Sequence, residues 1–599
     1  MLKDLNPVWN LEPIFPGGSN SPLLAAELDA LNSEFSVLIT KMNQLSQPSE
    51  AIWADLLQEV QTLANRFIQV AAFLEFLNAA DTADVKAQML FGRFFSLSAQ
   101  FEQILTLVNK LVLEETNEQW NALLLTPTFQ PYTFVLDEMR RQAAEKLPPE
   151  QENLISKLAS DGYKAWSSLY SRLVARVKIP LTEADGSEIL LSAGQAYNRL
   201  NDPDRSLREQ LLPKWEAAWQ DLAELGAHEL NSMMGFRLNL YEARGWDYMK
   251  EPLEMNRISK ATVDMMWQTI SENKTKLVAY YKRKQKLMGA DRLCWHDFYA
   301  PIGGVDQKCS YTEAANFIVE QFQGFSPKLA TFAEKAFRSR WVEAENRPGK
   351  GPGAFCSGLP IMKESRIFST YSGNLSNATT LAHELGHAFH NEAMKDLPAL
   401  NQNVGMCLAE TASNLNELVV ADAAIRNAKN DEEKLSLLAA KIEQAGSEMI
   451  NIHCRYIFED NFCKARKKGP LSAAEINQMM LDAQKIAYEN MLDVWHPTFW
   501  LSKGHFHGTG VPFYNFPYTF GFFFATGIYA KAKQVGADFE DTYIELLQHT
   551  GVMTVEQLAM RYLDADLTKK EFWQTAIDLS LENIDEFMML SEKILAARK

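Results

Sequence analysis

Long apolar runs are absent from this 599-residue chain. One very apolar stretch, residues 520–525, is far shorter than the roughly 20 residues that a helix needs to span a bilayer. The first residues, Met1 to Asn6, lack the apolar core of a secretory signal peptide. We therefore expect a cytoplasmic protein with no membrane partner.

Cysteine and positive charge are also in short supply. Six scattered cysteines include no Cys-x-x-Cys pair, which predicts reduced, mostly buried thiols rather than a disulfide framework. The 59 Lys and Arg face 76 Asp and Glu, for a net charge of −17. This charge argues against nucleic acid as a partner. The chain has no low-complexity segment and no internal repeat.

The chain as a whole has the composition of a globular protein, with 47% hydrophobic and 23% charged residues. Its length exceeds that of one hydrophobic core, so two or more subdomains are expected. Apolar residues at spacings of three and four predict a mainly helical chain. We expect helices at about 20–125, 149–173, 204–243, 259–289, 430–467, 471–494, 517–534 and 568–595.

Two places interrupt this helical pattern. Leu173–Pro180 has strand character, Asp185-Gly makes a turn, and Glu188–Leu191 could pair back as a hairpin. A Gly- and Pro-rich stretch at 347–360 leads into strand-like residues at 354–356 and at Arg366–Tyr371. We therefore predict small sheets within a helical fold.

The stretch that follows contains His-Glu-x-x-His. His383 and His387 are four residues apart, with Glu384 beside the first. On a helix these two imidazoles share a face and can bind one Zn²⁺. Glu384 lies about 100° round the helix, where it can take a proton from water that the metal activates. Gly386 would let another backbone approach closely. The alternative is an amphipathic helix with two solvated or core histidines.

The surrounding residues favour a helix here. Asn377 can cap its start, apolar residues follow at helical spacing, and no Pro interrupts it. His390 extends the stripe of His383 and His387. Two helical turns should carry it beyond the metal, so we interpret it as structural.

A catalytic zinc usually has three protein ligands plus water. In the helical pattern Met406–Glu417, Glu410 stands among apolar and small residues, and a polar stripe of Ser413, Asn414 and Glu417 follows it. Such a stripe indicates a site or its supporting residues, with an ordinary surface face as the alternative. Cys407 is a disfavoured ligand, because two His and a Glu complete a catalytic set.

A family resemblance becomes visible at these residues. His383-Glu-Leu-Gly-His387 followed by Ala409-Glu-Thr-Ala-Ser413 resembles the oligoendopeptidase F branch of the thimet oligopeptidase family of zinc metallopeptidases. Three further stretches extend the likeness over most of the chain: Trp9–Gly18, Arg347–Cys356 and Phe513–Gly521. The resemblance implies that Glu410 is the third ligand of one Zn²⁺ held with His383 and His387.

The resemblance also implies a fold. It is mainly α and zincin-like (gluzincin), with two helical halves flanking a deep substrate channel and a small β-sheet beside the metal helix. We expect an N-terminal helical domain at 1–185, forming one channel wall, and a catalytic zinc metallopeptidase domain at 186–599. By the same resemblance, Arg366–Tyr371 is a candidate edge strand for pairing with an extended peptide. An ordinary hairpin is the alternative.

The implied mechanism is peptide-bond hydrolysis with Glu384 as general base. Relatives use a His and Tyr residues from a C-terminal loop to donate hydrogen bonds to the oxyanion, and these map to His505, Tyr514 and Tyr518. The chain departs from the pattern at Phe522, where relatives commonly carry Tyr. It departs again at His507, usually an aromatic, to which we assign no role.

These features predict a zinc-dependent endopeptidase acting on internal bonds of oligopeptides. A dipeptidyl carboxypeptidase is the related alternative, although we place no clamp for a substrate carboxylate. A non-catalytic peptide-binding protein is the other alternative, and it should have lost a ligand or the base. All four of these residues are intact: His383, Glu384, His387 and Glu410. A His₂Glu site can also accept Co²⁺ or Mn²⁺.

Overall fold

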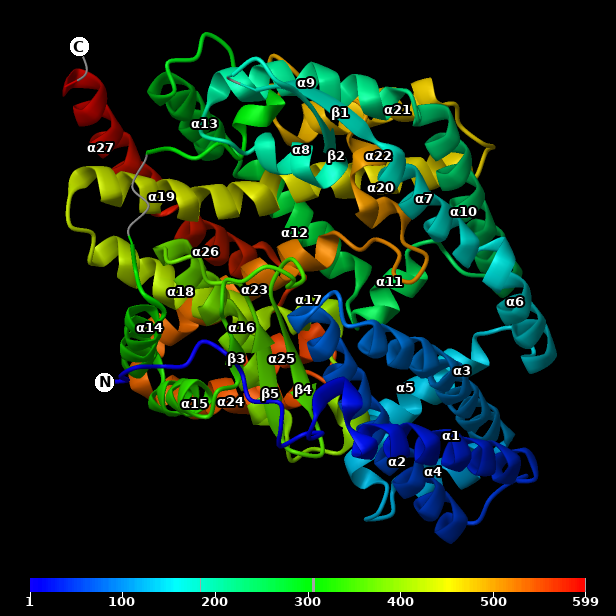
Figure 1. Cartoon of the computed structure of the whole chain (residues 1–599). Helices are drawn as coiled ribbons and strands as arrows, with labels where there is room; N and C mark the ends of the chain where they lie inside the picture. The colour runs from blue at the N-terminus through cyan, green and yellow to red at the C-terminus, as the bar shows by residue number, and fades with distance from the viewer. Residues whose placement is uncertain (184, 304–307, 598–599) are drawn as a thin grey trace. The chain divides into compact units, whose positions relative to one another are not determined.

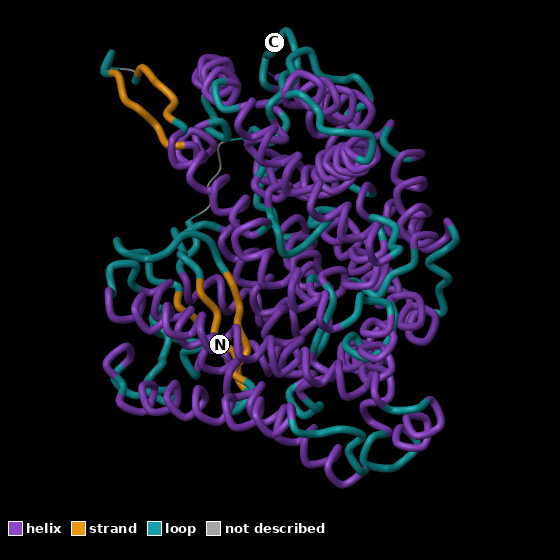
Figure 2. The backbone as a smooth tube through the Cα atoms, turned by 90° about the vertical axis from the view of Figure 1, so that its right-hand side faces the viewer, coloured by secondary structure: helices purple, strands orange, loops and turns teal. Residues whose placement is uncertain are grey.

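Helices account for most of the computed structural model, which describes residues 1–183, 185–303 and 308–597 (Figure 1). The prediction of a mainly helical chain is confirmed. Strands form only two small sheets in the described residues (Figure 2). No described helix is both long enough and apolar enough to cross a membrane.

The chain folds into two compact units, each built from separated segments. Unit 1 contains Met1–Pro149, Asp306–Val420 and Lys531–Leu563. Unit 2 contains Glu150–Val305, Ala421–Ala530 and Asp564–Lys599. The division at residue 185 stays a prediction, and its neighbour 184 lies outside the described residues. The chain passes between the units several times, which a reading along the sequence does not reveal.

The first part of unit 1 is a set of helices packed against one another. They are α1 (Pro22–Asn43), α2 (Glu50–Ala80), α3 (Val85–Glu114), α4 (Asn117–Leu124) and α5 (Thr133–Ala144). Helix α1 begins where Ser21 accepts a hydrogen bond from the Leu24 amide, with a proline at its first position. Its apolar residues at helical spacing are buried in one core with residues of α2 and α3.

The second part of unit 1 is a three-stranded sheet packed against a long helix. The strand order is β3 (Val342–Glu343), β5 (Glu364–Phe368), β4 (Phe355–Leu359), with β3 parallel and β4 antiparallel to β5. Helix α16 (Leu375–Met394) packs on β4 and β5. The predicted small sheet beside the metal helix is therefore confirmed.

The prediction that Arg366–Tyr371 forms an edge strand, however, is wrong. Arg366–Tyr371 begins inside β5, which has a partner on both sides, and β4 forms the edge instead. Arg366 is only 2% exposed. Its guanidinium is held inside the fold by Glu364 and by the Ser365 carbonyl.

Unit 1 contains further helices. They are α14 (Tyr311–Phe325), α15 (Pro327–Arg338), α17 (Met406–Ala409), the first part of α18 (Thr411–Arg426), α24 (Phe539–His549) and α25 (Val555–Leu563). Of these, α14, α15 and α24 pack against α16. Helix α16 starts earlier than predicted, because its cap is Asn374, whose side chain accepts from the Asn377 amide. Asn377 instead accepts hydrogen bonds from Ser372.

Unit 2 is helical apart from one hairpin. Strands β1 (Lys178–Thr182) and β2 (Glu188–Ser192) pair antiparallel as predicted, but residues 173–176 end helix α7 (Lys164–Arg176). The main helices are α9 (Arg205–Gln220), α10 (Ala223–Arg244), α12 (Lys260–Glu272), α13 (Thr275–Leu287), α19 (Asp431–Gly446), α20 (His453–Arg466), α21 (Ala473–Ala487), most of α23 (Phe516–Val535), α26 (Lys570–Leu581) and α27 (Ile584–Ala597).

Candidate metal centre

Helices α16 and α18 approach each other closely at a glycine. A Cβ atom on Gly386 would lie 2.5 Å from the Ala412 carbonyl oxygen and from the Ser413 Cα. The Asn416 side chain fixes the same contact by donating to the Ala382 carbonyl at 3.1 Å. This approach positions Glu410, the residue between α17 and α18, against the histidines of α16.

Three predicted ligands meet at this point. The Nε2 atoms of His383 and His387 lie 3.3 and 3.4 Å from the same oxygen, Glu410 Oε2. One ligand atom from each of the three residues lies within 4.8 Å of the others. Two imidazole nitrogens and one carboxylate oxygen are the donors of a catalytic zinc site with three protein ligands. The residues present therefore fit this metal.

Neighbouring side chains contact two of the three candidate ligands. Glu417 Oε1 lies 3.3 Å from His383 Nδ1, so with a metal bound this carboxylate would hold the ring proton on Nδ1 and leave Nε2 to coordinate. Ser413 donates a hydrogen bond of 2.7 Å to Glu410 Oε2. The polar stripe expected after Glu410 thus contains contacts to two of the ligands.

The electrostatics of this cluster favour a cation. Burial alone would lower the pKa of His383, but the Glu410 and Glu417 carboxylates raise it well above the usual range. For Glu410, burial is outweighed by His383 and His387, which lower its pKa. In this structure the carboxylates draw positive charge onto His383. A divalent cation between the same groups would supply that charge instead.

Glu384 borders the cluster without joining it. Its side chain is 4% exposed, and among the described residues its Oε2 has no hydrogen-bond partner. Burial raises the pKa of Glu384, an effect that His383 and His387 partly offset. The carboxylate lines a cavity of about 580 Å³ together with the three candidate ligands and with Ala354, Phe355 and Cys356 at the start of β4.

Two further residues near the motif have structural roles. His390 Nε2 lies 2.8 Å from Thr550 Oγ1, and burial lowers the pKa of His390 to about 4. The ring is therefore neutral and already hydrogen-bonded. Cys407 is fully buried and does not belong to the ligand group. None of the six cysteines, all of them within the described residues, forms a disulfide, and four are buried.

His505, Tyr514 and Tyr518 form a second cluster, which lies in unit 2. The ring centroids of His505 and Tyr514 are 4.8 Å apart, and His505 stacks on Tyr518 at 6.1 Å. The Tyr518 hydroxyl donates to the Tyr514 hydroxyl at 3.1 Å. All three side chains are half-buried. The structure thus brings these three predicted residues together, whereas the candidate metal ligands belong to unit 1.

The two departures from the family pattern are buried. Phe522 is 3% exposed and packs edge-on against Phe523. His507 lies with Nδ1 2.5 Å from Glu229 Oε2, with Nε2 3.0 Å from the Trp500 carbonyl, and stacked on Tyr170. His507 therefore anchors the loop that carries His505. The sequence held no signal that Glu229, 278 residues away, is its partner.

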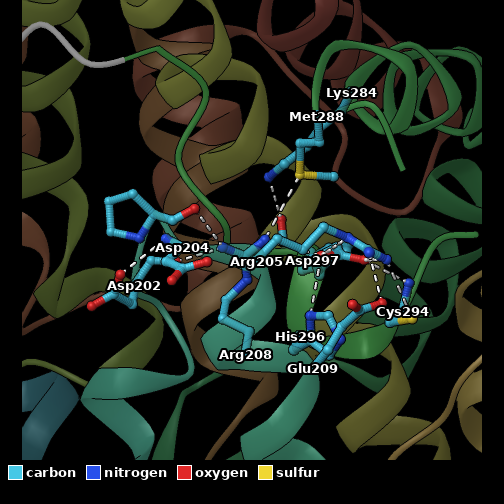
Figure 3. A network of polar contacts seen from close by, with 12 residues as sticks. Asp202, Asp204, Arg205, Arg208, Glu209, Lys284, Met288, Cys294, His296 and Asp297 are labelled. Atoms are coloured by element: carbon cyan, nitrogen blue, oxygen red, sulfur yellow. Dashed lines mark hydrogen bonds and ion pairs between the residues drawn. The ribbon is translucent and has the colours of Figure 1, made fainter. Parts of the chain in front are cut away.

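Metal-ligating side chains gather in one other place in the described part of the chain, at Glu209, Cys294 and His296 (Figure 3). There Arg205 already pairs with Glu209 at 2.6 Å and with Asp297 at 3.3 Å. Burial and then Asp297 raise the pKa of the Cys294 thiol to about 11. The Arg205 guanidinium already supplies the positive charge that a metal ion would bring, and the Cys294 thiol stays protonated. We therefore interpret this network as structural.

Family models and curated relatives match this chain over most of its length. Residues 199–579 match the model of Peptidase family M3, and residues 113–178 match that of Oligopeptidase F. An oligoendopeptidase F homolog of Lactococcus lactis subsp. lactis is 21% identical over 595 residues, covering 98% of this chain and 97% of that protein. Oligopeptidase PepF of Bacillus subtilis is 22% identical over 604 residues, covering 98% and 87%.

A solved structure shares the fold. The crystal structure of oligoendopeptidase-F from Enterococcus faecium matches with a TM-score of 0.71 at 18% identity, over 95% of this chain and 99% of that one. The expected zincin-like, mainly α fold is confirmed. Because the family model spans more than half of the sequence, the chain belongs to peptidase family M3 and is a peptidase.

Proposed function

We propose that this protein is a zinc-dependent endopeptidase that hydrolyses internal peptide bonds of oligopeptides. The proposal rests on one observation, the convergence of His383 and His387 Nε2 on Glu410 Oε2 beside the buried Glu384. His383, His387 and Glu410 would hold the metal. When bound, zinc supplies a Lewis acid that lowers the pKa of water to about 7 and polarises the scissile carbonyl.

Glu384 moves the proton in this mechanism. Its Oε2, which has no hydrogen-bond partner among the described residues, accepts a proton from the attacking water and then delivers it to the leaving amine. Burial, which raises the pKa of this carboxylate, makes it a stronger base than an exposed one. The charges of His383 and His387 limit the effect.

The start of β4 would align the peptide. Phe355 and Cys356 belong to the edge strand and line the same cavity as Glu384. An extended peptide that pairs with an edge strand gains main-chain hydrogen bonds that do not depend on its side chains. This mode of binding suits a peptidase that accepts varied oligopeptides.

We assign the oxyanion donors to the cluster in unit 2. Tyr514 and Tyr518 carry half-buried hydroxyls joined to each other, and His505 lies against both rings. All three are proposed to act on the bound peptide, with Tyr514 donating to the developing oxyanion and Tyr518 supporting it through its own hydrogen bond to the Tyr514 oxygen. Donors aimed at charge that develops only in the transition state raise turnover without tightening substrate binding.

Removing either hydroxyl should therefore slow catalysis. We expect Tyr514→Phe to lower kcat and kcat/KM together by about 10²–10³, with KM little changed. Tyr518→Phe should cost less, because the Tyr518 hydroxyl donates to Tyr514. Tyr197→Phe, at a residue with 41% exposure, is the matched control. Full kcat in both test variants, with normal thermal stability, would make the phenols packing residues.

An internally quenched peptide separates the endopeptidase from a dipeptidyl carboxypeptidase. We expect peptides with a free and with an amidated C-terminus to be cleaved at the same internal bond at similar rates, because the mechanism uses no contact with the terminal carboxylate. Mass spectrometry of the products is the measurement. Dipeptides released only from the free peptide would assign the chain to the alternative class.

A further inference from the structure

The partners of His505 determine which of its ring nitrogens carries the proton. His505 Nδ1 lies 2.7 Å from Asn515 Oδ1. The same oxygen accepts a hydrogen bond from the Arg455 guanidinium at 3.2 Å. A guanidinium can only donate, so the Asn515 atom at this point is the carbonyl oxygen and not the amide nitrogen. His505 must therefore donate from Nδ1.

Asn515 is not able to turn over and reverse this polarity. It is 1% exposed, and Arg455 is itself fixed by Asn451 and by the ring of Phe499 at 5.6 Å. The segment before it is clamped as well. The Phe513 amide donates to Glu459 at 2.9 Å and the Phe513 backbone has a φ of 51°, a strained value for a bulky residue.

The other ring nitrogen of His505 is consequently an acceptor. Burial, followed by Lys503, lowers the pKa of His505 to about 4, so the ring is neutral near pH 7. A neutral imidazole that carries its proton on Nδ1 has a lone pair on Nε2. A nitrogen in this state has no hydrogen to donate to an oxyanion.

The tyrosines of the cluster, in contrast, offer a hydrogen-bond donor. Because Tyr518 donates to the Tyr514 oxygen, the hydrogen of Tyr514 itself remains for a further partner. Side by side, the cluster presents one donor, Tyr514, and one acceptor, His505, with ring centroids 4.8 Å apart. A peptide chain offers the matching C=O and N–H groups.

We propose that His505 accepts a hydrogen bond at Nε2 from a backbone N–H of the bound peptide, and that Asn515 is the positioning residue that enforces this role. The proposal rests on the proposed function and refines it. Family resemblance implies that His505 donates to the oxyanion, whereas here the donor is Tyr514. Substrates that lack an N–H at the contacted position, by proline or N-methylation, should be poor.

The first test reads the tautomer directly and does not depend on activity. In protein labelled with ¹⁵N-histidine, His505→Gln identifies the His505 signals by their loss. We expect Nδ1 to be protonated and Nε2 to be unprotonated at pH 7. Asn515→Asp keeps an acceptor for Nδ1 and should preserve this state. Asn515→Leu removes the acceptor and should allow the proton to move to Nε2. A proton on Nε2 in the wild type would overturn the proposal.

The second test is an N-methyl scan of one cleavable peptide. In the wild type, methylation at one position should lower kcat/KM about tenfold, the loss of one hydrogen bond. In His505→Phe the same methylation should cost almost nothing further, and in Asn515→Asp the full penalty should remain. Equal penalties in the wild type and in His505→Phe at every position would contradict the contact.

The two tests separate this proposal from the one it rests on. If the wild type cleaves no peptide, the proposed function fails and the peptide contact fails with it. The assignment of the His505 proton is still decided by the ¹⁵N signals.

Discussion

Glu384→Gln should retain its metal and lose almost all turnover. The amide is the same size as the carboxylate but cannot accept the proton of the attacking water, and loss of a general base costs about 10²–10⁴ in rate. The metal should stay because Glu384 is not among the residues whose ligand atoms converge. Steady-state kinetics and metal analysis on one preparation measure both effects.

A neighbouring glutamate provides the control. Glu392 lies on the same helix, paired with Lys395 at 2.6 Å, and does not line the cavity of Glu384. Glu392→Gln should leave kcat unchanged. A zinc-loaded Glu384→Gln variant with the kcat of the wild type would remove Glu384 from the mechanism.

The second large effect is expected at Glu410. Glu410→Ala should lose the metal, because it leaves only His383 and His387, and a catalytic zinc needs three protein ligands. Both histidines face the same Glu410 oxygen, so the alanine variant leaves no carboxylate oxygen at the point where their Nε2 atoms converge. Zinc content after dialysis is the measurement.

Glu417→Ala is the matched comparison, since Glu417 contacts His383 through Nδ1 and not through the ligand atom. Loss of such a supporting group typically weakens metal binding about 10–100-fold. Close to one zinc per chain in Glu410→Ala would transfer the ligand role elsewhere, with Glu417 the first candidate.

Local geometry explains why part of the site was predictable. His383 and His387 lie on one helical face because they are four residues apart, and Gly386 is needed where α18 approaches. Glu410 was harder. It sits at a break between α17 and α18, where periodicity alone predicts one continuous helix. Its assignment as a ligand came from the family resemblance.

Contacts between segments far apart in the chain could not be predicted from the sequence. Nothing near Asn515 indicates that its carbonyl faces both Arg455 and His505, because those residues meet only in the folded unit. The edge strand was missed for a related reason, since a five-residue strand does not reveal which neighbours it pairs with. The helix cap was displaced by three residues, to Asn374, because both asparagines suit a cap.

The most direct test of the account is metal analysis combined with peptide cleavage. The purified chain should contain about one zinc, and a chelator should remove zinc and cleavage together. Adding one equivalent of zinc should restore both. Cleavage that continues at the same rate after zinc is removed would contradict a mechanism built on His383, His387 and Glu410.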